Sequence, residues 1–284
     1  MKSANKSFGL RENAAVKVLN YTVLILLTIM VLFPLYFAFV ISFKTNQEYL
    51  NTSPISLPHN FLNFDNYLFL FKNANLPRAF GNTMLFVVTS VVGSVLMGSM
   101  VAFALARLNL KYSKYIMLLF IIPMFIPGLT TQVSVFNIIS SMHLYNTIYA
   151  GIVLYLAADI VQIYLFTQFI EKVPRELDES ARMEGASYFR VYWNIIVPQL
   201  VPAFATVAIL RVVGIYNDLL TPYLYMPKSS LKTVTTALMS FATDRGTQWN
   251  MMTAGIVTIM IPTILLYLFL QRFIIAGLTD GAVK

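Results

Sequence analysis

Residues 18–42 read VLNYTVLILLTIMVLFPLYFAFVIS and contain no charged side chain. A helix of roughly 20 apolar residues crosses the hydrocarbon core of a bilayer, so this run is long enough to span a membrane. It also exceeds the apolar region of about 7 to 15 residues in a signal peptide, and no small-x-small cleavage site follows it. We therefore expect a helix that stays in the membrane.

Five further apolar runs of similar length lie at residues 80–106, 115–138, 148–170, 195–219 and 252–276. The chain is 58% hydrophobic and 11% charged, whereas soluble domains are about 25% charged. These features predict an all-α integral membrane protein with six transmembrane helices. We expect a cytoplasmic N-terminal tail (1–17), a membrane domain (18–276) with a cytoplasmic loop at 171–194, and a cytoplasmic C-terminal tail (277–284).

The positive charges indicate the orientation of these helices. With six spans both termini lie on one side, and that side carries 13 of the 20 Lys and Arg residues; the other side carries 6, and Arg211 lies inside a span. Because Lys and Arg are enriched in cytoplasmic loops, we expect both termini to be cytoplasmic. The net charge is +8, but the charged residues lie between the apolar runs and form no basic face on a soluble domain. We therefore expect no nucleic-acid partner.

Small residues and prolines mark how the helices pack. Ser94, Gly98, Ala102 and Ala106 are spaced four apart, which predicts a flat stripe where a neighbouring helix approaches closely. Prolines fall inside the apolar runs and are expected to bend their helices; they are Pro34, Pro123, Pro127, Pro198, Pro202 and Pro262. Bent helices suit either a gating motion or simple shape-fitting.

Two ionisable residues lie deep inside predicted spans, Asp159 in the fourth and Arg211 in the fifth. Charges in a membrane face protein or a watery cavity, and the similar depths of these two permit a salt bridge. They form either a structural pair that locks two helices or a polar lining of a substrate path. At the outer end of the fifth span, Tyr216, Asn217 and Asp218 offer the chemistry of sugar recognition, although an ordinary interfacial helix end has the same composition.

The loop at residues 171–187 reads EKVPRELDESARMEGAS. Pro174 suits the start of a helix, acidic residues fill the first turns, and Gly185 suits its end. Leu177 and Ala181 are four apart and would share an apolar face, flanked by Arg182 and carboxylates. The loop is therefore predicted to form a short surface helix, which is either solvated or docked on a partner.

This loop resembles the Glu-Ala-Ala loop of ABC importer permeases, in which the three residues are followed by Gly after three positions and by Ile-x-Leu-Pro after nine more. Glu179, Ser180 and Ala181 are followed by Gly185 at that spacing, and then by Ile195, Val197 and Pro198. Two positions depart from the pattern, because Ser180 replaces an alanine and Val197 replaces a leucine. The whole chain is most similar to the smaller maltose-type permease of the carbohydrate uptake family.

The resemblance implies a type I ABC importer permease fold in a bacterial cytoplasmic membrane. It implies that Glu179, Ser180, Ala181, Gly185, Arg182 and Leu177 belong to a coupling helix that docks on an ATPase. It further implies that Gly281 and Lys284 in the tail contact the ATPase, although one terminal glycine of the family pattern is missing. The outer stretch Asp244, Arg245 and Gly246 would contact an extracytoplasmic sugar-binding protein.

The partners implied by the resemblance are a second, different permease subunit, two ATPases and the binding protein, with an oligosaccharide as substrate. None of the twelve glycines forms a phosphate-binding P-loop, so ATP and Mg would be used by the partner ATPases, and we expect neither cofactor nor enzymatic activity in this chain. His59 and His143 lack companions at ligand spacing, so we expect no metal site. The alternative is a stand-alone ion-coupled secondary transporter with Asp159 and Arg211 as coupling groups.

Overall fold

The computed structural model describes residues 14–73, 75–243 and 246–282. Helices dominate this part of the chain, and the strands β1 (Ala242–Thr243) and β2 (Gly246–Thr247) form one short antiparallel hairpin. Three helices are long and apolar enough to cross a membrane, and they are α1 (Ala14–Ser42), α4 (Leu76–Arg107) and α15 (Trp249–Ala282).

The other three apolar runs are interrupted. The run at 148–170 forms α7 (Ile148–Leu156) and α8 (Ile160–Glu171), which meet at a 46° bend. In the fifth run a bend of 78° separates residues 188–199 from α12 (Val201–Tyr216), so the number of candidate spans in the described residues is three, or five if each bent pair is one span. The third run is divided among three shorter pieces, α5 (Ser113–Ile121), η1 (Ile122–Phe125) and α6 (Gln132–Ser141).

Prolines account for some of these breaks but not for all. Pro198 lies in α11 (Val197–Gln199) and Pro202 in the first turn of α12, so both flank the 78° bend. Pro34 and Pro262 lie inside unbroken helices. The break between α7 and α8 contains no proline, and Asp159 caps the new helix by accepting a hydrogen bond from the Gln162 backbone N–H at 2.8 Å.

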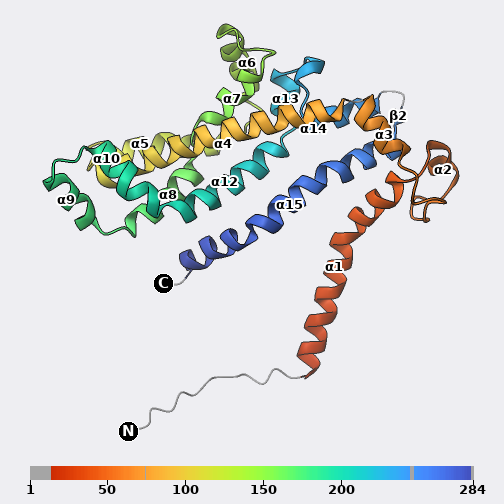
Figure 1. Cartoon of the computed structure of the whole chain (residues 1–284), viewed down its shortest axis with the longest axis horizontal. Helices are drawn as coiled ribbons and strands as arrows, with labels where there is room; N and C mark the ends of the chain where they lie inside the picture. Colours follow the sequence, from red (N-terminus) through yellow and green to blue (C-terminus); the bar gives the residue numbers. More distant parts are fainter. Residues whose placement is uncertain (1–13, 74, 244–245, 283–284) are drawn as a thin grey trace.

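The three long helices meet at one end of the molecule (Figure 1). The end of α1 and the starts of α4 and α15 lie together at one end of the molecule, near α2 (Asn46–Asn51) and α3 (Asp65–Lys72). The short helix α9 (Arg175–Met183) lies at the opposite end. The remaining short elements are α10 (Tyr188–Val191), η2 (Tyr192–Ile196), α13 (Leu220–Tyr225), η3 (Ser229–Leu231), α14 (Val234–Leu238) and η4 (Met239–Phe241).

The core forms around α4, which packs against α7, α8 and α12. The predicted stripe of small residues faces α8, and a Cβ added at Gly98 would lie 2.4 Å from Nε2 of Gln162. Gln162 is buried and its side-chain amide donates to the carbonyl of Ser94 at 2.5 Å. The stripe therefore places a polar side chain of α8 directly against the α4 backbone, as its spacing predicts.

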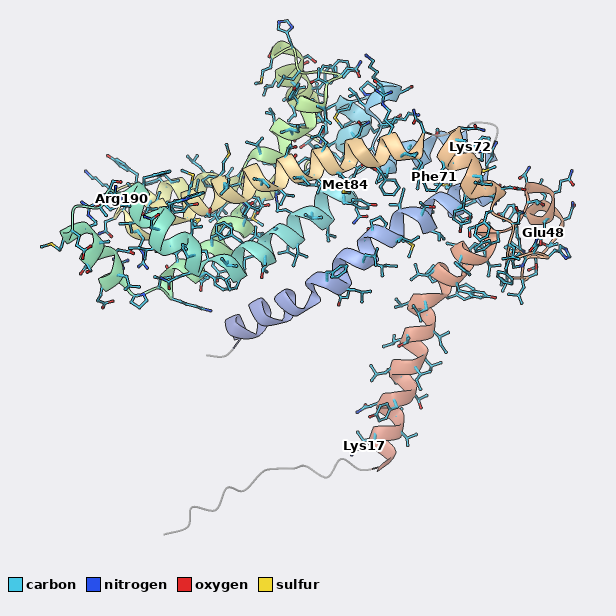
Figure 2. All side chains as sticks on the ribbon, viewed as in Figure 1. Lys17, Glu48, Phe71, Lys72, Met84 and Arg190 are labelled. Carbon is cyan, nitrogen blue, oxygen red and sulfur yellow. The ribbon has the colours of Figure 1, made fainter. Side chains whose placement is uncertain are left out.

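Helix α1 makes few contacts for most of its length, and its apolar side chains project outward on all sides (Figure 2). Only its end is buried, where Ile41 is fully enclosed. There the side-chain amide of Asn66 donates to the carbonyls of Ser42 and Lys44 at 2.8 and 2.9 Å, and Asn250 of α15 donates to Asn66 at 3.0 Å. A buried polar cluster thus ties α1, α3 and α15 together at this end.

Candidate functional site

The predicted loop helix forms as α9, and its boundaries follow from its sequence. Pro174 precedes its first residue, and acidic side chains lie in its first turn. At the other end the N–H groups of Gly185 and Ala186 donate to the carbonyls of Arg182 and Ala181, each at 3.0 Å. This pair of bonds is a Schellman motif, and it requires the left-handed conformation that Gly185 adopts at φ 85°. The chain therefore reverses at Gly185 and enters α10.

The exposed face of α9 differs in part from the predicted one. Leu177 is 44% exposed, as expected for a docking side chain. Ala181, predicted on the same apolar face, packs instead against the main hydrophobic core. Met183, in the last turn of α9, is 89% exposed. Glu179 and Ser180 lie on the exposed surface of the same helix.

Two of the contacts between α9 and its neighbouring helices were not predicted by the sequence pattern. The guanidinium of Arg182 lies 3.8 Å from the centre of the Tyr188 ring in α10. Arg107 Nε, from the last residue of α4, lies 2.9 Å from Oδ2 of Asp178. Burial raises the pKa of the Asp178 carboxyl above its ordinary value, and the neighbouring Arg107 charge opposes this shift.

A cavity of about 250 Å³ opens beside this ion pair, between α9 and the end of α4. Its lining mixes both signs of charge with aromatic side chains, from Phe103, Arg107, Asn109, Arg175, Asp178, Glu179, Arg182, Tyr188 and Val191. Glu179 thus lines a cavity of mixed charge and is also exposed on the surface of α9.

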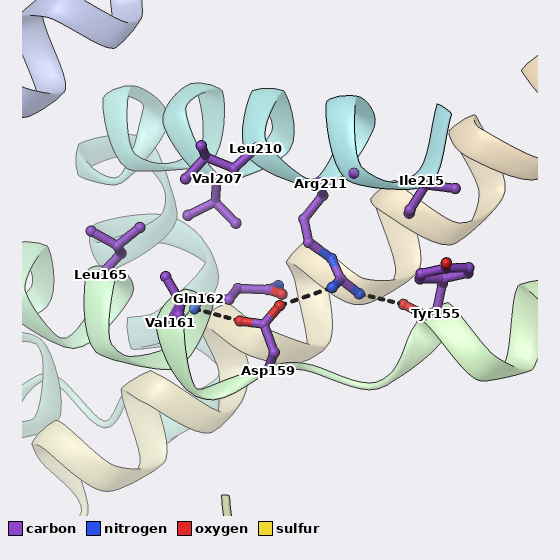
Figure 3. A pocket seen from close by; sticks show the side chains of 10 residues that line it. Tyr155, Asp159, Val161, Gln162, Leu165, Val207, Leu210, Arg211 and Ile215 are labelled. Atoms are coloured by element: carbon purple, nitrogen blue, oxygen red, sulfur yellow. Dashed lines mark hydrogen bonds and ion pairs between the residues drawn. The ribbon is translucent and has the colours of Figure 1, made fainter. Parts of the chain in front are cut away.

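The two charges predicted deep in the spans meet directly (Figure 3). Arg211 Nη1 of α12 donates to Oδ2 of Asp159 at 2.8 Å, and Arg211 Nη2 donates to the Tyr155 carbonyl at 2.8 Å and to Ser94 Oγ at 2.9 Å. The Asp159 side chain is 45% exposed and that of Arg211 is 16% exposed. They border a cavity of about 160 Å³ between α8 and α12. Through these bonds the pair connects α4, α7, α8 and α12, and it also lines the cavity.

The three residues predicted at the C-terminal end of α12 have different surroundings. Tyr216 is buried, and its hydroxyl donates to the Ile259 carbonyl of α15 at 3.0 Å, so it packs two helices together. Asn217 is exposed. Asp218 accepts a hydrogen bond from the hydroxyl of Tyr155, a residue that the sequence pattern did not single out. Because the Tyr155 carbonyl also accepts from Arg211, Tyr155 connects Asp218 to the Asp159–Arg211 pair.

Several predicted site residues carry no described contacts. Asp244, Arg245 and Lys284 lie outside the described residues. Gly246 begins β2, and Gly281 lies in the last turn of α15. Within residues 14–73, 75–243 and 246–282 there is no group of three His, Cys, Asp or Glu residues placed to hold a metal ion.

Comparison with curated proteins finds relatives along nearly the whole chain. The "Probable starch degradation products transport system permease protein AmyC" of Thermoanaerobacterium thermosulfurigenes is 34% identical over 262 residues, covering 92% of this chain and 94% of the relative. The "Melibiose/raffinose/stachyose import permease protein MelC" of Bacillus subtilis is 31% identical, covering 88% of this chain and 91% of the relative.

Solved structures share the fold at lower sequence identity. A bacterial ABC transporter involved in the import of the acidic polysaccharide alginate superposes with a TM-score of 0.81 at 19% identity, over 94% of this chain and 99% of that chain. A bacterial alginate ABC transporter in complex with an alginate pentasaccharide-bound periplasmic protein superposes with a TM-score of 0.63 at 19% identity, over 91% and 94% of the two chains.

The family model described as "Binding-protein-dependent transport system inner membrane component" matches residues 94–280. This range includes α9, the reversal at Gly185 and the Asp159–Arg211 pair. The chain therefore belongs to the family of binding-protein-dependent transport system inner membrane components.

Proposed function

We propose that this chain is a permease subunit of an ABC importer for oligosaccharides and forms half of the path through a bacterial cytoplasmic membrane. The substrate class is supported by relatives named for starch degradation products and for melibiose, raffinose and stachyose. A partner binding protein is supported by the periplasmic protein in the alginate transporter complex. A second, different permease subunit and two ATPases complete the proposed assembly.

Six spans with both termini in the cytoplasm fit this role. The interrupted pieces of the third, fourth and fifth apolar runs would each make one crossing together with their flanking turns. In this topology α9 lies on the cytoplasmic side, at the end of the molecule opposite to the starts of α4 and α15 (Figure 1). The excess of Lys and Arg residues on that side agrees with it.

The observation that carries the proposal is α9 itself, a short helix with exposed Leu177, Met183 and Glu179 that ends in a fixed reversal. A protruding helix that contacts neighbouring helices of its own chain can be displaced by a partner protein. Those contacts then transmit the displacement to the transmembrane helices. The chain has no P-loop of its own, so ATP would be bound and hydrolysed with Mg by the separate ATPases. The role of this chain is then mechanical, because it converts closure of the ATPases into movement of the helices around the path.

The reversal at Gly185 gives a direct test. A β-branched side chain is strongly disfavoured at φ 85°, so Gly185→Val should displace the end of α9. No heavy atom lies within 4 Å of the position that a Cβ would take, so a clash inside this chain would not be the cause. We expect the variant to insert into membranes normally and to lose at least about tenfold in ATP-driven uptake, a typical coupling factor.

Gly185→Asn is the matched control, because asparagine tolerates the left-handed conformation far better than valine does. It should retain most of the uptake of the unmodified complex. Uptake by the Gly185→Val complex equal to that of the unmodified complex would contradict the role of α9 in coupling.

A further inference from the structure

Arg107 lies where three elements of the cytoplasmic end meet. It is the last residue of α4, and its side chain is 6% exposed. Its Nη2 donates to the carbonyls of Ile170 in α8 and Val173 in the following turn, at 2.9 and 2.5 Å. Its Nε lies 2.9 Å from the Asp178 carboxylate in α9. One side chain thus contacts the end of α4, the end of α8 and the first turn of α9.

The electrostatics of this contact favour a fixed geometry. The last carbonyls of a helix have no partner within the helix and carry partial negative charge, and a cation placed there is stabilising. Arg107 supplies that cation to the end of α8, where its Nη2 donates to two carbonyls. The Nε of the same guanidinium faces the Asp178 carboxylate. A lysine has one ammonium group and cannot reproduce this forked pattern.

The contacts of Arg107 also determine which helices move together with α9. Only two residues, Lys172 and Val173, separate the last residue of α8 from Pro174, and Arg107 braces this connection through the Val173 carbonyl. Helix α4 in turn packs against α7, α8 and α12, the helices that hold the Asp159–Arg211 pair. A displacement of α9 therefore reaches the core of the membrane domain along α4 if the Arg107–Asp178 contact holds.

We propose that Arg107 is a positioning residue that clamps α9 to α4 and α8, so that these three helices move as one body when the ATPases close. This inference rests on the proposed function, because it assumes that α9 receives the movement of an ATPase. Arg107 and Asp178 act as a pair, and replacing either partner removes the ion pair that holds α9 firmly against α4, while leaving α9 able to dock.

The absence of cysteine makes the test direct, because two spin labels can be attached to introduced cysteines. One label at Glu176→Cys reports on α9, and one at Gly81→Cys reports on the exposed outer part of α4. The complete complex in lipid nanodiscs is measured by electron paramagnetic resonance before and after trapping with MgATP and vanadate. In the labelled complex that keeps both Arg107 and Asp178, we expect the distance between the two labels to stay the same on trapping.

Arg107→Lys and Asp178→Asn should each allow this distance to change by about 2 Å or more on trapping, the scale of helix shifts in switching proteins. The double variant should behave like either single variant, because both remove the same contact. Arg175→Lys is the matched control, because Arg175 lines the same cavity from an exposed position and donates to the Ala106 carbonyl over a longer distance, 3.3 Å. It should keep the distance fixed.

Co-purification of the ATPase distinguishes clamping from folding. We expect Arg107→Lys and Asp178→Asn to retain the bound ATPase at the level of the unmodified complex. Loss of the ATPase in both variants would make the contact a folding requirement and overturn the proposal. A fixed distance in both variants, a change in the unmodified complex, or an equal change in Arg175→Lys would also overturn it. If the unmodified chain binds no ATPase at all, the proposed function fails instead.

Discussion

At the scale of single residues, Arg211 is the most heavily bonded charge near the middle of the molecule. It donates to the Asp159 carboxylate, to Ser94 Oγ and to two backbone carbonyls beside the α7–α8 break. The Tyr155 and Ala157 carbonyls lie where α7 ends, and carbonyls at the end of a helix lack donors within that helix, so Arg211 supplies hydrogen bonds to them. The pair therefore stabilises an interrupted helix as well as bringing charge to a cavity.

Arg211→Met should destabilise the protein by about 1–3 kcal/mol, because it leaves several part-buried acceptors without their donor. Thermal unfolding of the purified chain in detergent measures this as a lower midpoint. The double variant Asp159→Asn/Arg211→Met should recover part of the loss, because it also removes the carboxylate that loses its partner. Arg190→Met, at an exposed position, is the control for charge removal. An Arg211→Met midpoint equal to that of Arg190→Met would show that the network does not support the fold.

The site residues differ in how well the sequence could predict them. Asp159 and Arg211 stand out because charge is rare within apolar runs, and they do meet in the structure. Arg107 and Tyr155 could not be recognised, since an arginine at the end of a span is ordinary and a tyrosine in a span carries no periodic signal. Their importance comes from contacts between segments far apart in the chain, which no local pattern encodes.

At the scale of elements, the α4 stripe makes a prediction with an internal control. Gly98→Ala should destabilise the chain by about 1–3 kcal/mol, because the new Cβ would lie 2.7 Å from Cδ and 2.9 Å from Cγ of Gln162. Gln162 cannot withdraw without breaking its bonds to Ser94. Gly81→Ala lies on the same helix with nothing within 4 Å of the new Cβ, and should be neutral or slightly stabilising.

Thermal unfolding of the two alanine variants, measured side by side in the same detergent, checks this difference. Equal midpoints for Gly98→Ala and Gly81→Ala would mean that α4 and α8 do not approach as closely as the structure shows.

Element boundaries were predictable where a residue has a local cause to end a helix. The start at Pro174 and the end at Gly185 of the α9 segment follow from their backbone preferences alone. The bend of 78° in the fifth run was predictable from Pro198 and Pro202, which flank it. The interruption between α7 and α8 was not predictable, because hydrophobic length does not distinguish a straight helix from a bent one. Pro34 and Pro262 lie in unbroken helices, whereas the α7–α8 bend occurs without any proline.

At the scale of the whole molecule, membrane character followed from composition, because the chain is 58% hydrophobic and has long uncharged runs. The arrangement of the helices around α4 did not follow, since spans in lipid pair through packing and polar contacts that depend on three-dimensional proximity. The family match over residues 94–280 agrees with the resemblance carried by the loop around Glu179. Under the proposed function, energy coupling is a property of the assembly, with this chain as one part.

Native extraction followed by reconstitution tests the central claim most directly. The chain is extracted from its membrane in mild detergent, its partners are identified by mass spectrometry, and the purified assembly is placed in proteoliposomes. Uptake of radiolabelled maltotriose, raffinose and stachyose is then measured with the binding protein present. We predict a co-purified ATPase, a second permease and uptake that requires ATP. A solitary chain that carries sugar without ATP, driven by an ion gradient, would contradict the account.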